Sequence, residues 1–143
     1  MSKYRFLLLL TIGVLIASLV VQVQAAKPES PLLKGAYRVD KDGWIYAHLE
    51  GTPFQVGYQN GYLLWDNIDV SYKANIHIWW SDEEYGDLWY AARDISRKYI
   101  WAKLTAEMKA EIEGIAAGVK ARGLKRDKWD ILAFNAWGDI SVY

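Results

Sequence analysis

The sequence predicts an α+β fold that is mainly helical, with one strand and about four helices. Residues 44–49 alternate between the two sides of an extended chain, which is the period of a strand. Four later stretches repeat apolar residues at helical spacing, and each follows a residue of a type that commonly caps helix N-termini. The 143 residues are 52% hydrophobic, as in a globular protein of about one domain.

Residues 1–25 have the layout of a secretory signal peptide. Lys3 and Arg5 precede an apolar run over residues 6–21, and small residues lead to a cleavage site after Ala25. The alternative is an uncleaved anchor, although the run is shorter than the ~20 residues that a spanning helix needs. We therefore expect a secreted or otherwise extracytoplasmic chain that meets the membrane only through this segment.

Composition excludes several kinds of site. The sequence has no cysteine, so it offers neither disulfides nor thiolate metal ligands. Its formal net charge is zero and it has no basic block, whereas nucleic-acid binding depends on neutralising phosphates. We expect no cofactor and no nucleic-acid partner.

Residues 26–42 form the next segment, which we interpret as an extended leader. It contains Pro28 and Pro31 and ends in the turn-forming residues 40–43. The strand of residues 44–49 opens the domain proper, residues 43–143. Because this strand has apolar or aromatic residues on both faces, we expect both faces to be covered.

The first helix is expected over residues 53–76. Thr52 and Gln55 form a capping box at its start. Gly57 and Gly61 lie on its apolar side, and each glycine costs a helix roughly 1 kcal/mol relative to alanine. Such a pair indicates that the backbone approaches a neighbour closely; the alternative is an early end to the helix.

Three more helices are expected. A capping box of Ser81 and Glu84 opens the second. Thr105 caps the third, and Gly123 ends it. Asp127 caps the fourth, which covers the segment KWDILAFNAWGD.

No catalytic, cofactor-binding or metal-binding residue is predicted. His48 and His77 lack the spacing of a local metal pair, and the acids 82–84 suit the first turn of a helix, where they complement the dipole. The eight tryptophans and ten tyrosines fit either of two interpretations: a sugar- or lipid-binding surface, most exposed at residues 78–80, or packing against partner layers.

Three segments in order resemble a known family. They are EGTPFQVGYQNGYLL, EGIAAGVKARGL and WDILAFNAWGD, beginning at Glu50, Glu113 and Trp129. Together they are similar to the N-terminal part of the acyl-coenzyme A:6-aminopenicillanic-acid acyltransferase (isopenicillin N acyltransferase) family of autoproteolytic N-terminal-nucleophile (Ntn) hydrolases, which is related to the phospholipase B-like proteins. The likeness covers residues 43–139, and its first segment is the most specific.

The resemblance implies an αββα sandwich made as a precursor that cuts itself before a cysteine. The freed cysteine is then nucleophile and, through its α-amino group, base, acting on amide or acyl bonds. The part upstream of the cut becomes an α chain that packs on the catalytic β chain. This sequence departs from the family at two positions: Asn60 stands where many relatives carry histidine, and Asp139 stands where they usually carry glutamate, four residues after the asparagine that matches Asn135. The resemblance assigns no catalytic residue to this chain.

These observations give two expectations. The first is the secreted N-terminal fragment or α chain of a cysteine Ntn hydrolase, inactive alone, whose partner is a catalytic β chain or missing C-terminal region with the N-terminal cysteine. The second is a self-sufficient exported binding module with an aromatic surface for lipid, sugar or protein.

Overall fold

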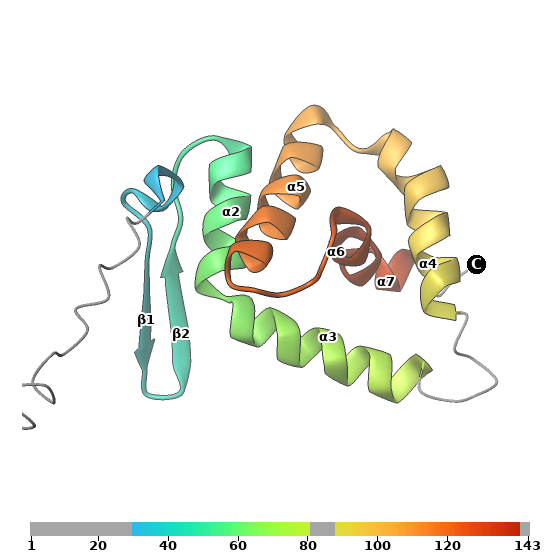
Figure 1. The fold of residues 1–143 in the computed structure, drawn as a ribbon, viewed down its shortest axis with the longest axis horizontal. Coiled ribbons are helices and arrows are strands. Elements are labelled where there is room, and N and C mark those ends of the chain that lie inside the picture. The colour runs from blue at the N-terminus through green and yellow to red at the C-terminus, as the bar shows by residue number, and fades with distance from the viewer. Residues whose placement is uncertain (1–29, 81–87, 141–143) are drawn as a thin grey trace, which may run out of the picture.

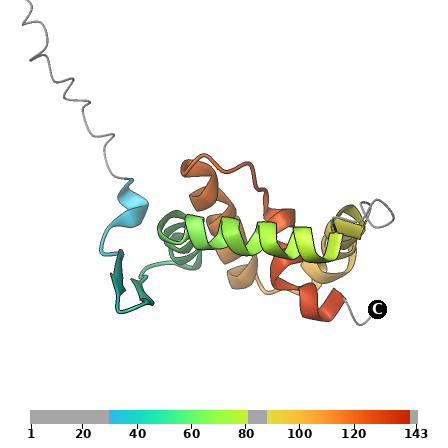
Figure 2. The same cartoon turned by 90° about the horizontal axis from the view of Figure 1, so that it is seen from below.

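The computed structural model describes residues 30–80 and 88–140, without the side chains of residues 76–80. Within these ranges the chain is mostly helical and carries one two-stranded antiparallel sheet. Figure 1 shows helices α2 and α5 side by side, the hairpin beyond α2, and α3 running beneath toward α4. Seen from below in Figure 2, α3 lies across one face of the other helices. The α+β class expected from the sequence is confirmed.

The sheet is a hairpin, so the expectation of a single strand is wrong. The leader forms a short 3₁₀ turn, η1 (Pro31–Leu33), and then strand β1 (Tyr37–Lys41), which pairs with β2 (Trp44–His48). Asp42 and Gly43 join the strands with φ of 53° and 81°. Positive φ at both positions is the geometry that favours Asp-Gly in two-residue hairpin turns.

The first expected helix is divided in two. Helix α2 (Pro53–Leu63) begins at the predicted capping box, in which both reciprocal hydrogen bonds of Thr52 and Gln55 are present. Its C-cap, Leu64, leaves helical geometry, with φ of −110° and ψ of 18°. Helix α3 (Trp65–Trp80) then starts in a new direction (Figure 1). The turn at Leu64 takes the chain from the hairpin side of the molecule to the side of α4.

Helix α5 (Ala106–Ala121) is the neighbour that the glycines of α2 approach, and the two helices run parallel (Figure 1). A Cβ added to Gly57 would lie 2.0 Å from the carbonyl oxygen of Glu111, and one added to Gly61 would lie 2.2 Å from that of Ile115. The close approach is confirmed, and the neighbour is a helix of this same chain.

The contact is reciprocal because α5 has a glycine pair of its own. A Cβ on Gly114 would lie 2.3 Å from the carbonyl oxygen of Phe54, and one on Gly118 would lie 2.2 Å from that of Tyr58. Both pairs are spaced by four residues, so each helix presents one turn of bare backbone to the other.

The ends of α5 are those predicted. The Thr105 side chain accepts a hydrogen bond from the Met108 amide at 3.2 Å. At the other end Gly123 adopts φ of 93°, and the Leu124 amide donates to the carbonyl of Val119 at 3.1 Å. These features form a Schellman motif, in which a left-handed glycine lets the last carbonyls be satisfied.

The remaining helices form the other end of the molecule. Helix α4 (Leu88–Ile95) continues into a π-helical turn, η2 (Ser96–Ile100), and a 3₁₀ turn, η3 (Trp101–Lys103). The predicted capping box of Ser81 and Glu84 lies outside the described residues. The expected fourth helix is two, α6 (Lys128–Asn135) and α7 (Trp137–Ile140), because the backbone of Ala136 leaves helical geometry, with φ of −92° and ψ of 10°.

This end has an apolar core of its own. Its buried residues are Ala92, Ala133, Ala136 and Ile140. The partly buried side chains that pack against them are Trp89, Ile95, Ile100 and Trp137. They come from α4, α6 and α7. The small alanines let α4 and α6 lie close together, and the larger partly buried side chains close the cluster.

Candidate functional site

The two faces of the hairpin have different surroundings. The strand register pairs Arg38 with Ala47, which places them on one face. Arg38 donates to the carbonyl oxygen of Leu63 at 2.9 Å and to the carboxylate of Asp66 at 2.6 Å. The hydrogen bond from Arg38 lowers the pKa of Asp66 below its ordinary value. This face is therefore anchored at the junction of α2 and α3.

The opposite face is aromatic and exposed. We define the aromatic hairpin face as Tyr37, Val39, Trp44, Tyr46 and His48, which the register places together, with Lys41 beside Trp44 at its end. Trp44 is 70% exposed, Tyr46 58% and Tyr37 56%. Tyr37 and His48 stack with ring centroids 5.2 Å apart. The expectation that both faces of this strand are covered is wrong for the described residues, and the face is a concentrated aromatic surface of the kind found at interfaces.

Gln59 connects the hairpin to the helices from the buried side. It is 1% exposed, and its amide nitrogen donates to the carbonyls of Leu32 and Glu50 at 2.8 and 2.9 Å. Its side-chain oxygen accepts from the Glu50 amide at 2.8 Å. One side chain of α2 thus holds both the leader and the loop that follows β2.

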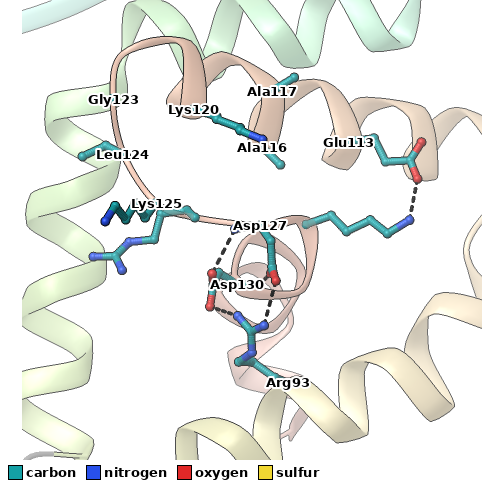
Figure 3. Close-up of a pocket in the computed structure, with 12 residues that line it drawn as sticks. Arg93, Glu113, Ala116, Ala117, Lys120, Gly123, Leu124, Lys125, Asp127 and Asp130 are labelled. Carbon is teal, nitrogen blue, oxygen red and sulfur yellow. Dashed lines mark hydrogen bonds and ion pairs between the residues drawn. The ribbon is translucent and has the colours of Figure 1, made fainter.

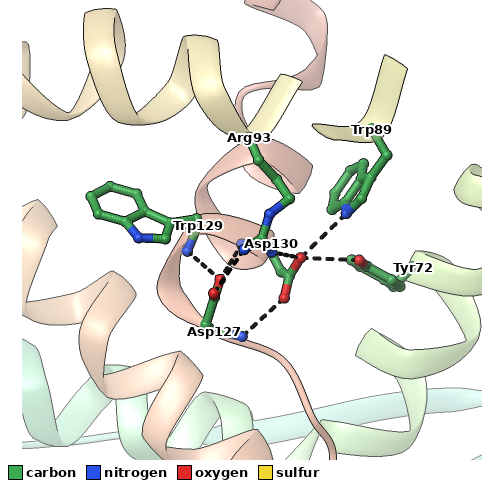
Figure 4. Close-up of polar contacts among 6 residues, drawn as sticks. All are labelled: Tyr72, Trp89, Arg93, Asp127, Trp129 and Asp130. Atoms are coloured by element: carbon green, nitrogen blue, oxygen red, sulfur yellow. Dashed lines mark hydrogen bonds and ion pairs between the residues drawn. The ribbon is translucent and has the colours of Figure 1, made fainter. Parts of the chain in front are cut away.

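A second polar centre lies between α3, α4 and α6. We call it the Asp130 cluster; it consists of Tyr72, Trp89, Arg93, Asp127 and Asp130 (Figure 4). The Asp130 carboxylate is buried and accepts from the Tyr72 hydroxyl at 3.2 Å, from the Trp89 indole at 3.3 Å and from Arg93. The Asp127 amide donates to its other oxygen at 3.0 Å. Asp130 therefore has donors from two other helices, α3 and α4, and from the N-cap of its own helix.

Arg93 joins this carboxylate to the cap of α6. Its second guanidinium nitrogen donates to Asp127 at 2.8 Å. Burial acts to raise the pKa of Asp127, but hydrogen bonds from Arg93 and from backbone amides outweigh it, so this pKa lies below its ordinary value. Burial raises the pKa of the Tyr72 hydroxyl well above its usual range, and the charge of Asp130 adds to that effect. The hydroxyl stays protonated and remains a donor.

An open pocket of about 620 Å³ lies beside the Asp130 cluster, between α5 and the start of α6 (Figure 3). Ala116 and Ala117 of α5 and Leu124 of the connecting loop form its apolar wall. Ionic side chains of both signs line the rest: Arg93, Glu113, Lys120, Lys125, Arg126, Asp127, Lys128 and Asp130. We call it the α5–α6 pocket.

The residues singled out in the sequence do not gather at one place. His48 lies on the hairpin, and its imidazole is 3.5 Å from the carboxylate of Glu50. Asn60 serves the end of α2, where its carbonyl accepts from the Leu64 amide. Asn135 donates to the carbonyl of Ile131 at 2.8 Å, and Asp139 is exposed on α7. Residues 82–84 and the side chains of residues 77–80 lie outside what the structure describes.

Sequence reasoning missed the Asp130 cluster. Its one sequence signal is Asp130 at the third position after Asp127, where both reciprocal hydrogen bonds of a capping box form. Its other partners are distant in sequence, so no local pattern points to them. Among the described residues, no group of three potential metal ligands comes together.

Comparison with models of protein families, with curated proteins and with solved structures gives no match. In the part of the chain that is described, no helix has the length and apolar character to cross a membrane.

Proposed function

We propose that this chain is the α-chain part of an exported cysteine Ntn hydrolase that acts on amide or acyl bonds. On this proposal it is inactive alone and packs against a catalytic chain or region whose N-terminal residue is cysteine. The three ordered segments that resemble the acyltransferase family support the proposal. The observation that carries it is the aromatic hairpin face, which is exposed in this chain; in the family, the α-chain strand packs on the catalytic part, and we propose the same for this face.

The helical segments of the resemblance suit such a role. The glycines of the first two segments, Gly57, Gly61, Gly114 and Gly118, meet in one helix crossing. The third segment contains Asp127's capping partner Asp130 and the apolar residues of α6. The segments therefore support one helical scaffold that presents the hairpin at one side.

The test is to isolate the native product with an affinity tag from the organism that exports it. We expect a second polypeptide at one-to-one stoichiometry, or a longer product, whose sequencing shows a newly formed N-terminal cysteine. Iodoacetamide should label this cysteine and abolish amide hydrolysis by the complex. A product containing only the present chain, together with a downstream reading frame that encodes no such cysteine, would contradict the proposal.

The aromatic hairpin face also fits a second candidate, a self-sufficient binding module for lipid, sugar or protein. That candidate expects residues 26–143 alone to be a monomer with a cooperative melt. The α-chain proposal expects the isolated segment to aggregate or to bind hydrophobic dyes through exposed apolar surface. Size-exclusion chromatography and calorimetry on the same sample distinguish the two.

A further inference from the structure

Strand β1 forms an open edge of the sheet. Figure 1 shows β2 between β1 and helix α2, so β1 lies on the outer side of the hairpin. The sheet has only these two strands in the part of the chain that is described. An edge of this kind can pair with a further strand unless a proline, a bulge or a covering segment prevents it. Residues 37–41 contain no proline, and they pair with β2 one to one, without a bulge.

The register determines which backbone groups of β1 point outward. Lys41 and Trp44 flank the two-residue turn, so they form a hydrogen-bonded pair, and such pairs alternate along an antiparallel ladder. The N–H and C=O groups of Arg38 and Asp40 therefore point away from β2. Among the described residues, no backbone hydrogen bond to these outward groups is found. An extended strand of another molecule offers donors and acceptors at the same two-residue spacing.

The charges of β1 are complementary to those of a second copy of the same strand. Charged side chains commonly protect an edge against pairing. In an antiparallel pair centred on Val39, however, Arg38 of each copy lies opposite Asp40 of the other, and Tyr37 lies opposite Lys41. A shift by two residues in either direction would place Arg38 opposite Arg38 or Asp40 opposite Asp40. Opposite charges directly across a ladder are favourable and like charges are unfavourable, so the charges favour the pair centred on Val39.

This pairing leaves the existing contacts of β1 in place. The Arg38 guanidinium keeps its bonds to Asp40, to Asp66 and to the carbonyl of Leu63 within its own copy. The Asp40 side chain is 61% exposed, so it has room for a second cation beside the first. The two Arg38–Asp40 ion pairs would lie next to each other with opposite charges adjacent.

We propose that two copies of this chain associate weakly through their β1 strands, which form an antiparallel pair with a two-fold axis beside Val39. The contact is isologous, as in most homodimers, and it joins the two hairpins into one sheet. One pairing of five-residue strands is at the small end of interface sizes, so the dimer dissociates on dilution. The aromatic hairpin faces of both copies lie on the same side of this sheet. They stay open, so the association goes beyond the proposed function without competing with it.

A single cysteine at the two-fold axis tests the pairing, because the chain has no cysteine of its own. Val39 would face its own copy in a non-hydrogen-bonded pair, whose Cα atoms lie about 4.5 Å apart, close enough for a disulfide. We expect Val39→Cys to form a disulfide-linked dimer about tenfold faster than Val70→Cys, since pairing raises the effective concentration of the thiol. Val70 is a stringent control because it lies on α3 and is 67% exposed, against 46% for Val39. The exported chain is oxidised as isolated, with any partner still bound, and mass spectrometry measures the linkage between two copies.

A second pair of variants separates strand pairing from random collision. In the Val39→Cys chain, Asp40→Pro removes an outward N–H, at a position where an edge strand tolerates proline. Asp40→Asn removes the same charge but keeps the N–H. We expect the proline variant to crosslink as slowly as Val70→Cys, whereas the asparagine variant should stay well above that rate.

Two results would overturn the inference. One is crosslinking of Val39→Cys that is no faster than that of Val70→Cys. The other is equal crosslinking with Asp40→Pro and with Asp40→Asn, which would indicate collision of exposed thiols without strand pairing. Neither result depends on whether an N-terminal cysteine partner exists, so the inference and the proposed function fail separately.

Discussion

The four glycines of the α2–α5 crossing allow close packing because they have no side chain. Each places its Cα where a side chain would meet a carbonyl oxygen of the opposite helix. The obstacle is backbone in every case, and backbone cannot rotate aside as a flexible side chain does. The roughly 1 kcal/mol that each glycine costs its own helix is offset by the contact that it permits.

Gly61→Ala should therefore destabilise the chain by about 2 kcal/mol, the usual scale of overpacking in a tight contact. The added methyl group would lie 2.2 Å from the carbonyl oxygen of Ile115. The matched control is Gly138→Ala in α7, where an added Cβ meets nothing within 4 Å and should gain up to about 1 kcal/mol of helix propensity. Urea denaturation followed by circular dichroism measures both; equal effects would contradict the close approach.

Asp127 gives a prediction about pH. Its pKa is lower in the folded chain than the ordinary 3.8, so the stability that its charge contributes is present above about pH 4. This stability is lost as the pH falls through the folded-state pKa. Asp127→Asn keeps an N-capping side chain but removes the charge, so its deficit relative to the unaltered chain should be largest near pH 6 and should shrink below pH 4. Urea midpoints at pH 6, 4 and 3 measure it, and a constant deficit would contradict the role of the charge.

Residues whose partners are near in sequence were predictable. The caps Thr52, Thr105 and Asp127 bond to amides two or three positions away, and all three are confirmed. The Asp130 cluster was not predictable, because Tyr72, Trp89 and Arg93 lie 58, 41 and 37 positions from Asp130. A second glycine pair at Gly114 and Gly118 was present in the sequence as a signal for the partner of α2.

At the scale of elements, the leader is held by a single side chain. Gln59 satisfies a carbonyl in the leader and both backbone groups of Glu50. Gln59→Ala would leave partly buried backbone groups of Leu32 and Glu50 without this partner, which costs up to about 1–3 kcal/mol for each group that water does not reach. The hairpin, which lies between these two attachment points, depends on the same bonds.

We therefore expect Gln59→Ala to lower stability by about 3 kcal/mol and to speed tryptic cleavage after Lys34. Gln55→Ala is the control, since its side chain caps only the start of α2 and should cost about 1 kcal/mol. Cleavage rates at low trypsin, followed by mass spectrometry, test this. Equal cleavage of the two variants would show that the leader is held by other contacts.

The sequence predicted element types better than their extents. Strand β2 and helices α2, α5 and α6 begin where the caps and turns indicate. The bend at Leu64 has no glycine or proline at the turn to mark its position. An early end to the helix was expected only as the alternative to close packing of Gly57 and Gly61, whereas the structure has both. Strand β1 was missed although Asp42 and Gly43 mark a hairpin turn, because the flanking residues 37–41 include three charged side chains.

At the scale of the whole molecule, burial is uneven. Apart from Leu33 in η1, the buried side chains among the described residues belong to the helical part, while every residue of β2 is exposed. Local stability follows burial, so amide exchange should be slowest in α5 and α6 and fastest in the hairpin.

Hydrogen exchange with mass spectrometry should show exchange in peptides covering residues 37–48 at least tenfold faster than in residues 110–119, because the hairpin buries little apolar surface. On the proposed function, a bound catalytic chain should slow exchange in the hairpin, and Trp44→Ser with Tyr46→Ser should remove that protection. Tyr90→Ser with Tyr99→Ser, which changes two exposed aromatic residues elsewhere, is the control. Hairpin exchange as slow as that of α5 in the isolated chain would contradict the uneven stability.

The crossing of α2 and α5 also fixes alignment. Two matched pairs four residues apart leave one alignment at which both fit, and the nearest alternative that keeps a glycine at the crossing is a slip of four residues, about 6 Å. A slip of that size would keep only one glycine of each pair at the crossing and would push a side chain into the other place. Only the native alignment of α2 and α5 therefore allows their backbones to approach closely. In any other alignment, side chains at the crossing would keep the two helices further apart.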